Sequence, residues 1–399
     1  MRALLITDWM SAPGGAESYI TWIRDALRAS GDEVRLLTST AGSAGDGSAE
    51  YRAFGTDRRA AQAFLQIVNP FAVVQVRGAL RRFRPDVVLV NMFEHHLSPA
   101  ILSQLREVPS VLTLTDYKCI CPIGSKLLPN GHLCTEKAGA ICRRYGCVSL
   151  PHWLRDRPRY ALIRAGLRQV DRVLACSRWV QRELAGNGIE AECLPLPVPE
   201  PGQDFRRAPA SSPLFVYCGR LDTEKGLLLL LHAFARVRAE VPAAQLRIVG
   251  RGPQRPILDH LVDTLGLQGA VTFRGWIAPS KVERELVDAW ALVAPSLWAE
   301  PLGLVALEAI VRGVPVIASA SGGFGETIDH GAGGLLFQNG HEGELVERLK
   351  AVATGNAFPS HAVPDEVIRR VRESYSLGRH VDRLRCILAE VAGVAAGRP

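Results

Sequence analysis

Short apolar runs of four to six residues recur along the chain, and stretches with helical periodicity separate them. Runs this apolar are typical of strands that are buried on both faces of a parallel sheet. They occupy residues 3–7, 34–39, 86–90, 110–115 and 172–176 in the first half, and 214–218, 246–250, 271–275, 291–295, 315–319 and 334–337 in the second. The alternation predicts an α/β chain with two doubly wound, Rossmann-like domains that face each other across a cleft.

The intervening segments predict helices and domain boundaries. Residues 58–84 have a helical pattern that Asn69-Pro70 breaks into two, and further helices are expected at 99–106, after Pro151 and at 379–393. A proline-rich stretch at 194–202 leads into a linker at 201–212. We therefore expect an N-terminal domain over 1–200 and a C-terminal domain over 213–375. A final helix in 376–399 is expected to pack back on the N-terminal domain.

Composition limits the class of protein. Hydrophobic residues make up 47% of the 399 positions and charged residues 22%, which excludes a disordered chain. No apolar run approaches the roughly 20 residues of a membrane span, and the start is too short for a signal peptide. Cytoplasmic residence is the expectation.

The positive charge is concentrated in residues 1–200, which hold 25 Lys and Arg against 19 Asp and Glu. Arginines gather at 77–84 and again along 143–172, and the first group adjoins the apolar residues of 58–84. These features have two interpretations: a solvated basic face over a packed core, or docking on anionic lipid heads or a pyrophosphate-bearing acceptor. The second predicts peripheral association with the cytoplasmic face of the inner membrane. Nucleic acid is not expected as a partner, since no basic–aromatic reading motif is present.

Residues 116–150 interrupt the strand–helix pattern and contain five of the nine cysteines. Four thiolates suit a structural zinc ion, while reduced structural thiols are the alternative, because the spacing lacks a C-x-x-C pair. Disulfides are disfavoured in a cytoplasmic protein. The proposed ligands are Cys121, Cys134, Cys142 and Cys147, with Cys119 or His132 in reserve.

The segment 296–309, S-L-W-A-E-P-L-G-L-V-A-L-E-A, carries two carboxylates eight positions apart. If Pro301 lies in the first turn of a helix, Glu300 sits at its mouth and Glu308 roughly two turns along. The early amides, around Gly303 and Leu304, are then free to hold an anion.

Other polar and glycine-rich segments follow predicted strands. Arg220 and Lys225 follow 214–218, where two cations would neutralise a diphosphate. Glycines that let a ligand approach the backbone follow three more strands: Gly14 and Gly15 in the first half, Gly250 and Gly252, and Gly322 and Gly323. A surface loop or an ordinary turn would explain each alone. In the second half these segments and 296–309 all fall at the carboxyl ends of strands, so together they predict one nucleotide-sugar site there.

The second half resembles the family-4 retaining glycosyltransferases of GT-B fold. The matching pieces are G-R-L-x-x-E-K-G, I-V-G-x-G-P, V-x-F-x-G-W, E-P-L-G-L-V-A-L-E-A and G-V-P-V-I-A-S-x-S-G-G, over most of 213–350. The first half is similar through P-G-G-A-E, and its cysteine loop resembles a subgroup with a cysteine-bearing insertion.

The resemblance implies a role for each matching residue. Arg220 and Lys225 would bind the donor diphosphate and stabilise its departure, which makes them catalytic together with Glu300, which faces the donor sugar. Glu308 would hold the ribose. The remaining donor-binding positions are Gly14, Gly15, Gly250, Gly252, Gly303, Leu304, Gly322 and Gly323. Such enzymes generally need no catalytic metal or other cofactor.

One departure lies on the acceptor side. The family commonly has a histidine where this chain has Thr115, directly before Asp116, and another where it has Asn91. Thr115 can hydrogen-bond a sugar hydroxyl but cannot act as a base near neutral pH. Either Thr115 suffices as the catalytic residue there, or His95 or His96 enters from the neighbouring loop, or activity is reduced.

The predicted function is retaining transfer of a hexose from a nucleotide diphosphate sugar to a glycan, lipid-linked or small-molecule hydroxyl. The alternatives are a GT-B sugar-nucleotide epimerase and a non-catalytic protein that binds sugar nucleotides.

Overall fold

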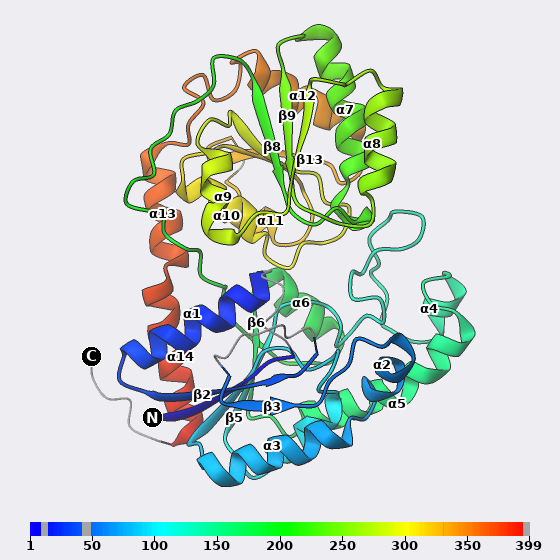
Figure 1. Cartoon of the computed structure of the whole chain (residues 1–399), viewed down its shortest axis with the longest axis vertical. Coiled ribbons are helices and arrows are strands. Elements are labelled where there is room, and N and C mark those ends of the chain that lie inside the picture. The colour runs from blue at the N-terminus through cyan, green and yellow to red at the C-terminus, as the bar shows by residue number, and fades with distance from the viewer. Residues whose placement is uncertain (9–14, 42–48, 330, 394–399) are drawn as a thin grey trace. The chain divides into compact units, whose positions relative to one another are not determined.

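The computed structural model describes residues 1–8, 15–41, 49–329 and 331–393, and the chain forms two compact units. The first comprises Met1–Gly124, Thr135–Pro197 and Leu377–Pro399, and the second comprises Ser125–Cys134 and Val198–Ser376. Each unit has its own sheet and helices (Figure 1).

The first unit contains a sheet covered by helices. Its strands are β1 (Arg2–Ile6), β2 (Glu33–Ser39), β3 (Tyr51–Ala53), β4 (Val87–Val90), β5 (Ser110–Leu114), β6 (Arg172–Ala175) and β7 (Glu192–Cys193). Its helices are α1 (Gly15–Ala29), α2 (Arg59–Leu65), α3 (Pro70–Phe83), the 3-10 helix η1 (Pro99–Leu105), α4 (Ala140–Arg144), α5 (Leu150–Leu167), α6 (Arg178–Gly186) and α14 (Leu377–Ala392).

The second unit repeats this plan. Its strands are β8 (Leu214–Cys218), β9 (Gln245–Val249), β10 (Val271–Gly275), β11 (Ala291–Ala294), β12 (Val316–Ser319) and β13 (Gly334–Phe337). Its helices are the 3-10 helix η2 (Thr223–Lys225), α7 (Leu227–Glu240), α8 (Arg255–Thr264), α9 (Pro279–Leu286), α10 (Leu304–Val311), α11 (Phe324–Thr327), α12 (Glu342–Ala353) and α13 (Asp365–Tyr375).

Both sheets are parallel. The first has the strand order β3-β2-β1-β4-β5-β6-β7 and the second has the order β10-β9-β8-β11-β12-β13. In each sheet the chain adds strands on one side of its first strand and then continues on the other side. Strands β4, β5, β11 and β12 are buried at every position, as expected for strands covered on both faces. The two doubly wound domains predicted from the sequence are confirmed. The edge strands β3 and β7 were not predicted, because they have only three and two residues and no apolar run.

Side-chain caps mark the starts of α3 and α6. The side chain of Asn69 accepts a hydrogen bond from the amide of Ala72 and caps α3, which confirms the predicted break before Pro70. Ser177 caps α6 in the same way through the amide of Val180. The expected α-helix at 99–106 is instead the 3-10 helix η1, which begins with a proline.

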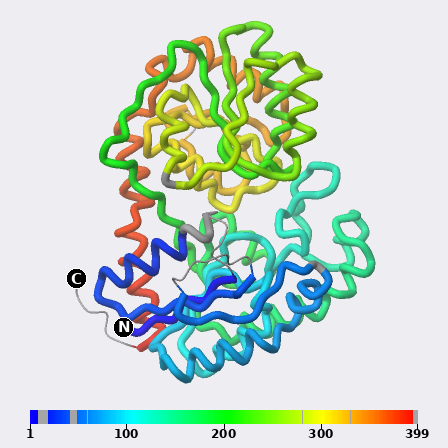
Figure 2. The backbone as a smooth tube through the Cα atoms, viewed as in Figure 1, coloured from blue at the N-terminus to red at the C-terminus, as the bar shows by residue number. Residues whose placement is uncertain are grey.

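The last helix, α14, belongs to the first unit and lies beside α1 (Figures 1 and 2). Tyr19 of α1 is buried against His380 of α14, and their polar atoms are 3.1 Å apart. The other ring nitrogen of His380, Nδ1, lies 2.8 Å from the carbonyl oxygen of Pro195. Because a carbonyl can only accept, Nδ1 carries the hydrogen and Nε2 accepts from the tyrosine.

Two segments differ in placement from the expected domain limits. Residues 125–134, in the cysteine-rich insertion, group with the second unit, whereas the prediction placed the whole insertion with the N-terminal domain. The predicted linker at 201–212 is bound to the second unit, since the amides of Ala208 and Ala210 donate to the carbonyls of Val287 and Asp288. Backbone hydrogen bonds, which composition does not reveal, fix this segment.

Candidate functional site

Four loops of the second unit meet at the carboxyl edge of its sheet. They follow β8, β9, β11 and β12, and strands that run parallel end at the same edge. The amide of Leu297, after β11, donates to the carbonyl of Glu224, after β8, at 2.8 Å. The amide of Leu221 donates to the carbonyl of Arg251, after β9, at 3.0 Å. The structure therefore brings the predicted donor-binding residues of this half to one edge.

Lys225 and Glu300 form the centre of this edge. Lys225 Nζ lies 2.7 Å from Glu300 Oε1, and their side chains are only 16% and 10% exposed. Ser296 Oγ donates to the same oxygen at 2.6 Å, and Lys225 Nζ lies 4.7 Å from the centre of the Trp298 ring. Burial alone would raise the pKa of Glu300, but Lys225 and these hydrogen bonds hold that pKa below its usual value. Glu300 is therefore an ionised acceptor in a fixed position.

Arg220 lies on the same loop with its side chain 64% exposed. Its guanidinium pairs with Asp222 and, at 2.8 Å, with Glu224. Exposed ion pairs of this kind contribute little, about 0–1 kcal/mol. A ligand anion can therefore replace them at small cost.

The helix expected from Pro301 begins at Leu304, after Gly303, whose φ is 83°. Pro301 is therefore not in the first turn, and that prediction is wrong, because the left-handed residue turns the chain just before α10. The amide of Ala306 donates to the carbonyl of Gly303 at 2.9 Å. The amides of Leu304 and Val305 precede it and have no partner within the helix, which leaves them available to an anion.

Glu308 lies in the second turn of α10 and is half-buried. Burial raises the pKa of its carboxyl group, and the charge of Arg312 offsets this only in part. Arg312 donates to the backbone carbonyl of Glu308 at 3.0 Å. Among the described residues the carboxylate itself has no hydrogen-bond partner, so it is available to a ligand.

The predicted donor-binding glycines after β9 and β12 pack closely against other backbone atoms of the protein. A Cβ at Gly250 or Gly252 would lie 1.8 Å from the Gly219 carbonyl oxygen or 2.4 Å from the Leu221 carbonyl oxygen. At Gly322 and Gly323 the nearest atoms would be the Glu300 carbonyl oxygen at 2.2 Å and the Leu302 Cα at 2.6 Å. These four glycines let the strand-end loops pack on one another. The bridge between Glu300 and Gly322 then holds the carboxylate in place.

In the first unit, buried or half-buried charged side chains follow β1, β4 and β5. Asp8, after β1, accepts from the amides of His95, His96 and Leu97 at 2.7–2.9 Å. Beside this turn, Lys118 Nζ lies 3.1 Å from Asp116 Oδ2 and within hydrogen-bond distance of His95 Nε2.

Glu94 is buried next to this pair. Its Oε2 accepts from the amide of Phe93 at 3.1 Å, and Cys119 Sγ lies 3.5 Å from Oε1. We call Asp8, Glu94, His95, Asp116, Lys118 and Cys119 the acidic–basic cluster.

Burial and mutual charge set the pKa values in this cluster. Burial and the charge of Asp116 raise the pKa of Glu94 to about 7. Burial and the charge of Lys118 lower the pKa of His95 to about 4, so its ring is neutral at physiological pH. Burial would lower the pKa of Lys118, but Asp116, Glu94 and Asp8 outweigh it and raise that pKa. Burial also raises the pKa of Cys119 well above its usual value.

Of the predicted first-half residues, the structure places Thr115 beside this cluster and His95 within it. Thr115 is half-buried at the end of β5, directly before Asp116. His95 joins the cluster, whereas the ring of His96 is buried 3.9 Å from Asp57. Gly15 begins α1, and Gly14 lies outside the described residues. Sequence reasoning did not select Asp8, Glu94 or Lys118 and named Cys119 only as a reserve zinc ligand, although all four lie within four residues of a predicted strand.

The four proposed zinc ligands are not assembled. Among the residues that the structure describes, no group of three or more His, Cys, Asp and Glu is arranged to hold a metal ion. Cys134 follows a hairpin in which Leu127 and Leu133 form an antiparallel bridge. This hairpin and Cys134 belong to the second unit. Cys121, Cys142 and Cys147 belong to the first unit.

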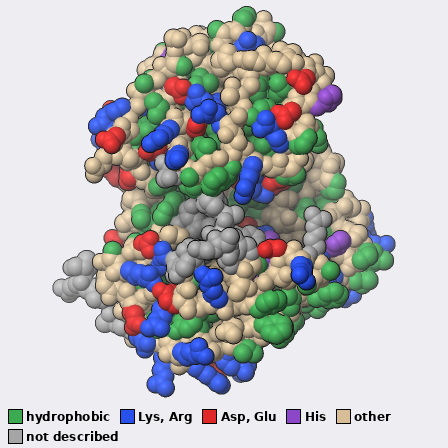
Figure 3. All heavy atoms as spheres, viewed as in Figure 1, with side chains coloured by type: hydrophobic (Ala, Val, Ile, Leu, Met, Phe, Trp, Pro, Cys, Tyr) green, Lys and Arg blue, Asp and Glu red, His purple; other side chains and the backbone are tan. Residues whose placement is uncertain are grey.

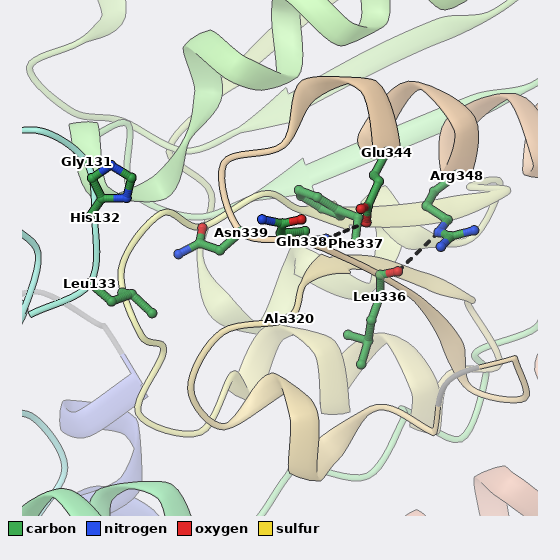
Figure 4. A pocket seen from close by; sticks show the side chains of 10 residues that line it. All are labelled: Gly131, His132, Leu133, Ala320, Leu336, Phe337, Gln338, Asn339, Glu344 and Arg348. Carbon is green, nitrogen blue, oxygen red and sulfur yellow. Dashed lines mark hydrogen bonds between the residues drawn. The ribbon is translucent and has the colours of Figure 1, made fainter. Parts of the chain in front are cut away.

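The second unit also has an open pocket of about 700 Å³ between the hairpin tip, 131–133, and the end of β13 (Figure 4). Glu344 accepts from the amide of Gln338 at 2.8 Å, and Arg348 donates to the carbonyl of Leu336 at 3.1 Å. Asn339 donates to the carbonyl of Leu297 at 2.6 Å, which ties the pocket wall to the loop that carries Glu300.

Family models match both halves of the chain. Residues 14–199 match the model described as a glycosyl transferase 4-like domain, and residues 203–365 match that of glycosyl transferases group 1. Both matches agree with the resemblance drawn from the sequence motifs.

The curated relatives include a glycogen synthase and a mannosyltransferase. The chain is 30% identical over 274 residues to a glycogen synthase of Mycobacterium tuberculosis, which is 65% of this chain and 58% of that protein. It is 36% identical over 159 residues to a GDP-mannose-dependent alpha-(1-6)-phosphatidylinositol monomannoside mannosyltransferase of the same species, covering 36% and 41%. The chain thus spans less than two thirds of either relative.

Solved structures share the fold over nearly the whole chain. The sucrose-phosphate synthase of Thermosynechococcus elongatus has a TM-score of 0.76 at 23% identity, covering 98% of this chain and 99% of that one. Anabaena Alr3699/HepE in complex with UDP and glucose has a TM-score of 0.70 at 17% identity, covering 98% and 100%. At these identities the likeness establishes the GT-B fold.

Proposed function

Because the chain belongs to the glycosyltransferases, with a 4-like domain in its N-terminal half and a group 1 domain in its C-terminal half, we propose that it is a retaining hexosyltransferase. It moves a sugar from a nucleoside diphosphate to a hydroxyl group of a glycan, a lipid-linked sugar or a small molecule. The observation that carries the proposal is the Lys225–Glu300 pair beside the unpartnered amides that open α10.

The donor half of the site follows from these contacts. Lys225 donates one N–H to Glu300, and its remaining N–H groups bind the diphosphate. Arg220 and the amides of Leu304 and Val305 bind the diphosphate as well. Glu300 accepts hydrogen bonds from the sugar hydroxyls. The carboxylate of Glu308 accepts hydrogen bonds from the ribose hydroxyls.

In the transfer step, the acceptor oxygen forms a bond to the anomeric carbon while the bond from that carbon to the phosphate oxygen breaks. The electron pair of the broken bond leaves with the diphosphate. The proton of the acceptor hydroxyl passes to the departing phosphate oxygen, on the same face of the sugar, so configuration is retained. Arg220 and Lys225 stabilise the negative charge that develops there, and no metal or other cofactor is required.

The descriptions of two related proteins support this donor class. One relative is described as a GDP-mannose-dependent mannosyltransferase, and one structural neighbour was solved with UDP and glucose. The base and the sugar used by this chain are to be found by screening nucleoside diphosphates for thermal stabilisation, because a tight ligand stabilises the folded state.

We further propose that the enzyme is cytoplasmic and associates peripherally with anionic membrane surfaces. Four apolar side chains on and between α2 and α3 are 46–75% exposed: Phe64, Val68, Phe71 and Val74. Arg81 and Arg82 lie in the last turn of α3. Figure 3 shows hydrophobic and basic side chains over the region where Figure 1 places these helices. No described helix is long and apolar enough to cross a membrane.

Substitution of the donor residues tests the transferase. Lys225→Ala and Glu308→Ala should each reduce transfer at least a hundredfold, because each removes charge or hydrogen bonds that face the donor. Transfer is measured by release of nucleoside diphosphate in the presence of acceptor, and the product anomer is assigned by NMR. Exposed Lys281→Ala and Glu366→Ala serve as matched controls.

Three outcomes would contradict the proposal. Full activity in both variants would exclude this site. Product formation without an acceptor would identify an epimerase. Nucleotide binding by the wild type without transfer to any member of an acceptor panel would identify a non-catalytic binding protein.

A further inference from the structure

The acidic–basic cluster of the first unit has an accessible end and a buried end. The side chains of Lys118 and Asp116 are 27% and 23% exposed, whereas Asp8 and Glu94 are buried. The accessible pair follows β5 at the carboxyl edge of the first sheet, which is where open α/β sheets bind ligands.

The accessible pair is held rigidly by its surroundings. The amide of Lys118 donates to Asp116 Oδ1 at 2.9 Å, and the hydroxyl of Tyr160 donates to the carbonyl of Lys118 at 3.1 Å. The stem of Lys118 crosses Gly124, where a Cβ would approach its Cγ to 3.0 Å. The backbone of His95 is fixed by Asp8, so its ring meets the ammonium group from a set direction. A site built this way is preorganised.

The hydrogen-bonding capacity that remains matches a hydroxyl group. Of the three N–H groups of Lys118, one faces Asp116 Oδ2 and one faces His95 Nε2. In the part of the chain that the structure describes, the third has no partner. The Asp116 carboxylate beside it keeps lone pairs that can accept. A hydroxyl both accepts and donates, and it can bond to both groups at once.

The charge balance disfavours an anionic ligand here. Three carboxylates, Asp8, Glu94 and Asp116, lie near two cations, Lys118 and Arg159. The described residues of the cluster therefore hold no excess of positive charge. A phosphate or carboxylate would have to displace Asp116 from Lys118 and would then lie beside it uncompensated.

We propose that Lys118 and Asp116 bind a hydroxyl group of an uncharged, sugar-like acceptor, with His95 as the positioning residue that orients the Lys118 ammonium group. The inference rests on the proposed transferase function and adds the chemical class of the acceptor at this point.

The experiment compares an uncharged glycoside with the same glycoside bearing a phosphate, using the full-length enzyme and its nucleotide-sugar donor. The wild type is expected to use the uncharged acceptor better. Lys118→Met should raise the acceptor KM about tenfold, the effect of losing roughly 1.4 kcal/mol of binding, and leave the Kd for nucleoside diphosphate within twofold. Lys137→Met, an exposed lysine of the insertion, is the matched control.

Two further variants separate a binding role from a structural one. Asp116→Asn releases the charge of Lys118 and should shift the preference toward the phosphate-bearing acceptor. This reversal is not expected from a loss of folding. His95→Gln keeps an oxygen that can accept from Lys118, and it should have a lower acceptor KM than His95→Ala.

The outcomes distinguish the inference from the function on which it rests. Transfer with an unchanged acceptor KM in Lys118→Met overturns the inference and leaves the transferase standing. A wild-type preference for the phosphate-bearing acceptor that Lys118→Met abolishes also overturns it, since Lys118 would then bind an anion. Failure of the wild type to transfer to either glycoside, while it binds nucleotide, overturns both.

Discussion

At the scale of single residues, the glycines of the strand-end loops in the second unit act by leaving room for neighbouring backbone. Gly322 has φ of 64°, and its missing side chain leaves room for the Glu300 carbonyl oxygen. The amide of Gly323 donates to the same carbonyl at 2.7 Å. The pair therefore positions Glu300, whereas the sequence pattern had suggested direct contact with the donor.

Replacement of Gly322 by alanine tests this role. Gly322→Ala should destabilise the second unit by about 3 kcal/mol, since it combines a left-handed backbone with a contact of 2.2 Å to a carbonyl oxygen. Donor affinity should fall with it. Gly325→Ala, three positions on in α11, meets nothing within 4 Å and should change stability by less than about 1 kcal/mol. Equal effects in denaturant unfolding would contradict the argument.

At the scale of elements, a buried histidine connects α14 to the rest of the first unit by hydrogen bonds. His380 is 5% exposed and links Tyr19 of α1 to the carbonyl of Pro195. Burial lowers the pKa of His380 to about 4. The folded state therefore binds fewer protons than the unfolded state between pH 6.5 and about 4. This contribution to stability is complete above pH 6.5 and is lost as the pH falls.

The pH dependence of unfolding tests the contribution of His380 to stability. Relative to His380→Gln, the wild type should lose about 3 kcal/mol of unfolding free energy between pH 7 and pH 4. Both proteins keep the other titrating groups, so their difference isolates His380. His152→Gln, on the exposed face of α5, should follow the wild-type curve. Parallel curves for all three proteins would show that His380 does not couple α14 to pH.

At the scale of the whole molecule, charge and exposed apolar area are both concentrated in the first unit. Val76, Ala72, Ala79 and Phe83 of α3 are buried, as the packed-core interpretation requires. Phe64 and Phe71 nevertheless remain 75% and 58% exposed. Phe71 stacks edge-on against Phe54 at 5.4 Å, and Phe54 is itself 47% exposed. The packed-core interpretation therefore holds for the buried face of α3, and the exposed phenylalanines are the side chains on which the membrane proposal depends.

Vesicle binding tests the exposed face. A Phe64→Ser and Phe71→Ser double variant should lose most of its affinity for vesicles that contain phosphatidylglycerol, because each phenylalanine contributes about 2 kcal/mol when buried in the interface. Binding is measured by co-sedimentation at low and high salt. Ile257→Ser, an exposed apolar residue of the second unit, is the control. Wild-type protein that fails to bind such vesicles would exclude the membrane proposal.

The sequence by itself determined the two parallel sheets, the helix breaks and the edge of each sheet at which polar residues gather. These depend on short apolar runs and on capping residues, which act within a few positions of the chain. It also selected Lys225 in one short motif and Glu300 and Glu308 in another, because each motif is nearly continuous in the sequence. The start of α10 was misplaced because the backbone turn at Gly303 was not recognised.

Only the tertiary structure decided what lies beside what. Asp8 reaches the amides of His95–Leu97 across 87 to 89 positions, and Lys225 reaches Glu300 across 75. Cys134 groups with the second unit, whereas the other predicted zinc ligands, although close to it in sequence, group with the first. Burial and charge at such contacts set the pKa values of Glu94 and His95. Contacts between distant segments arise when sheets and loops pack, so local pattern cannot supply them.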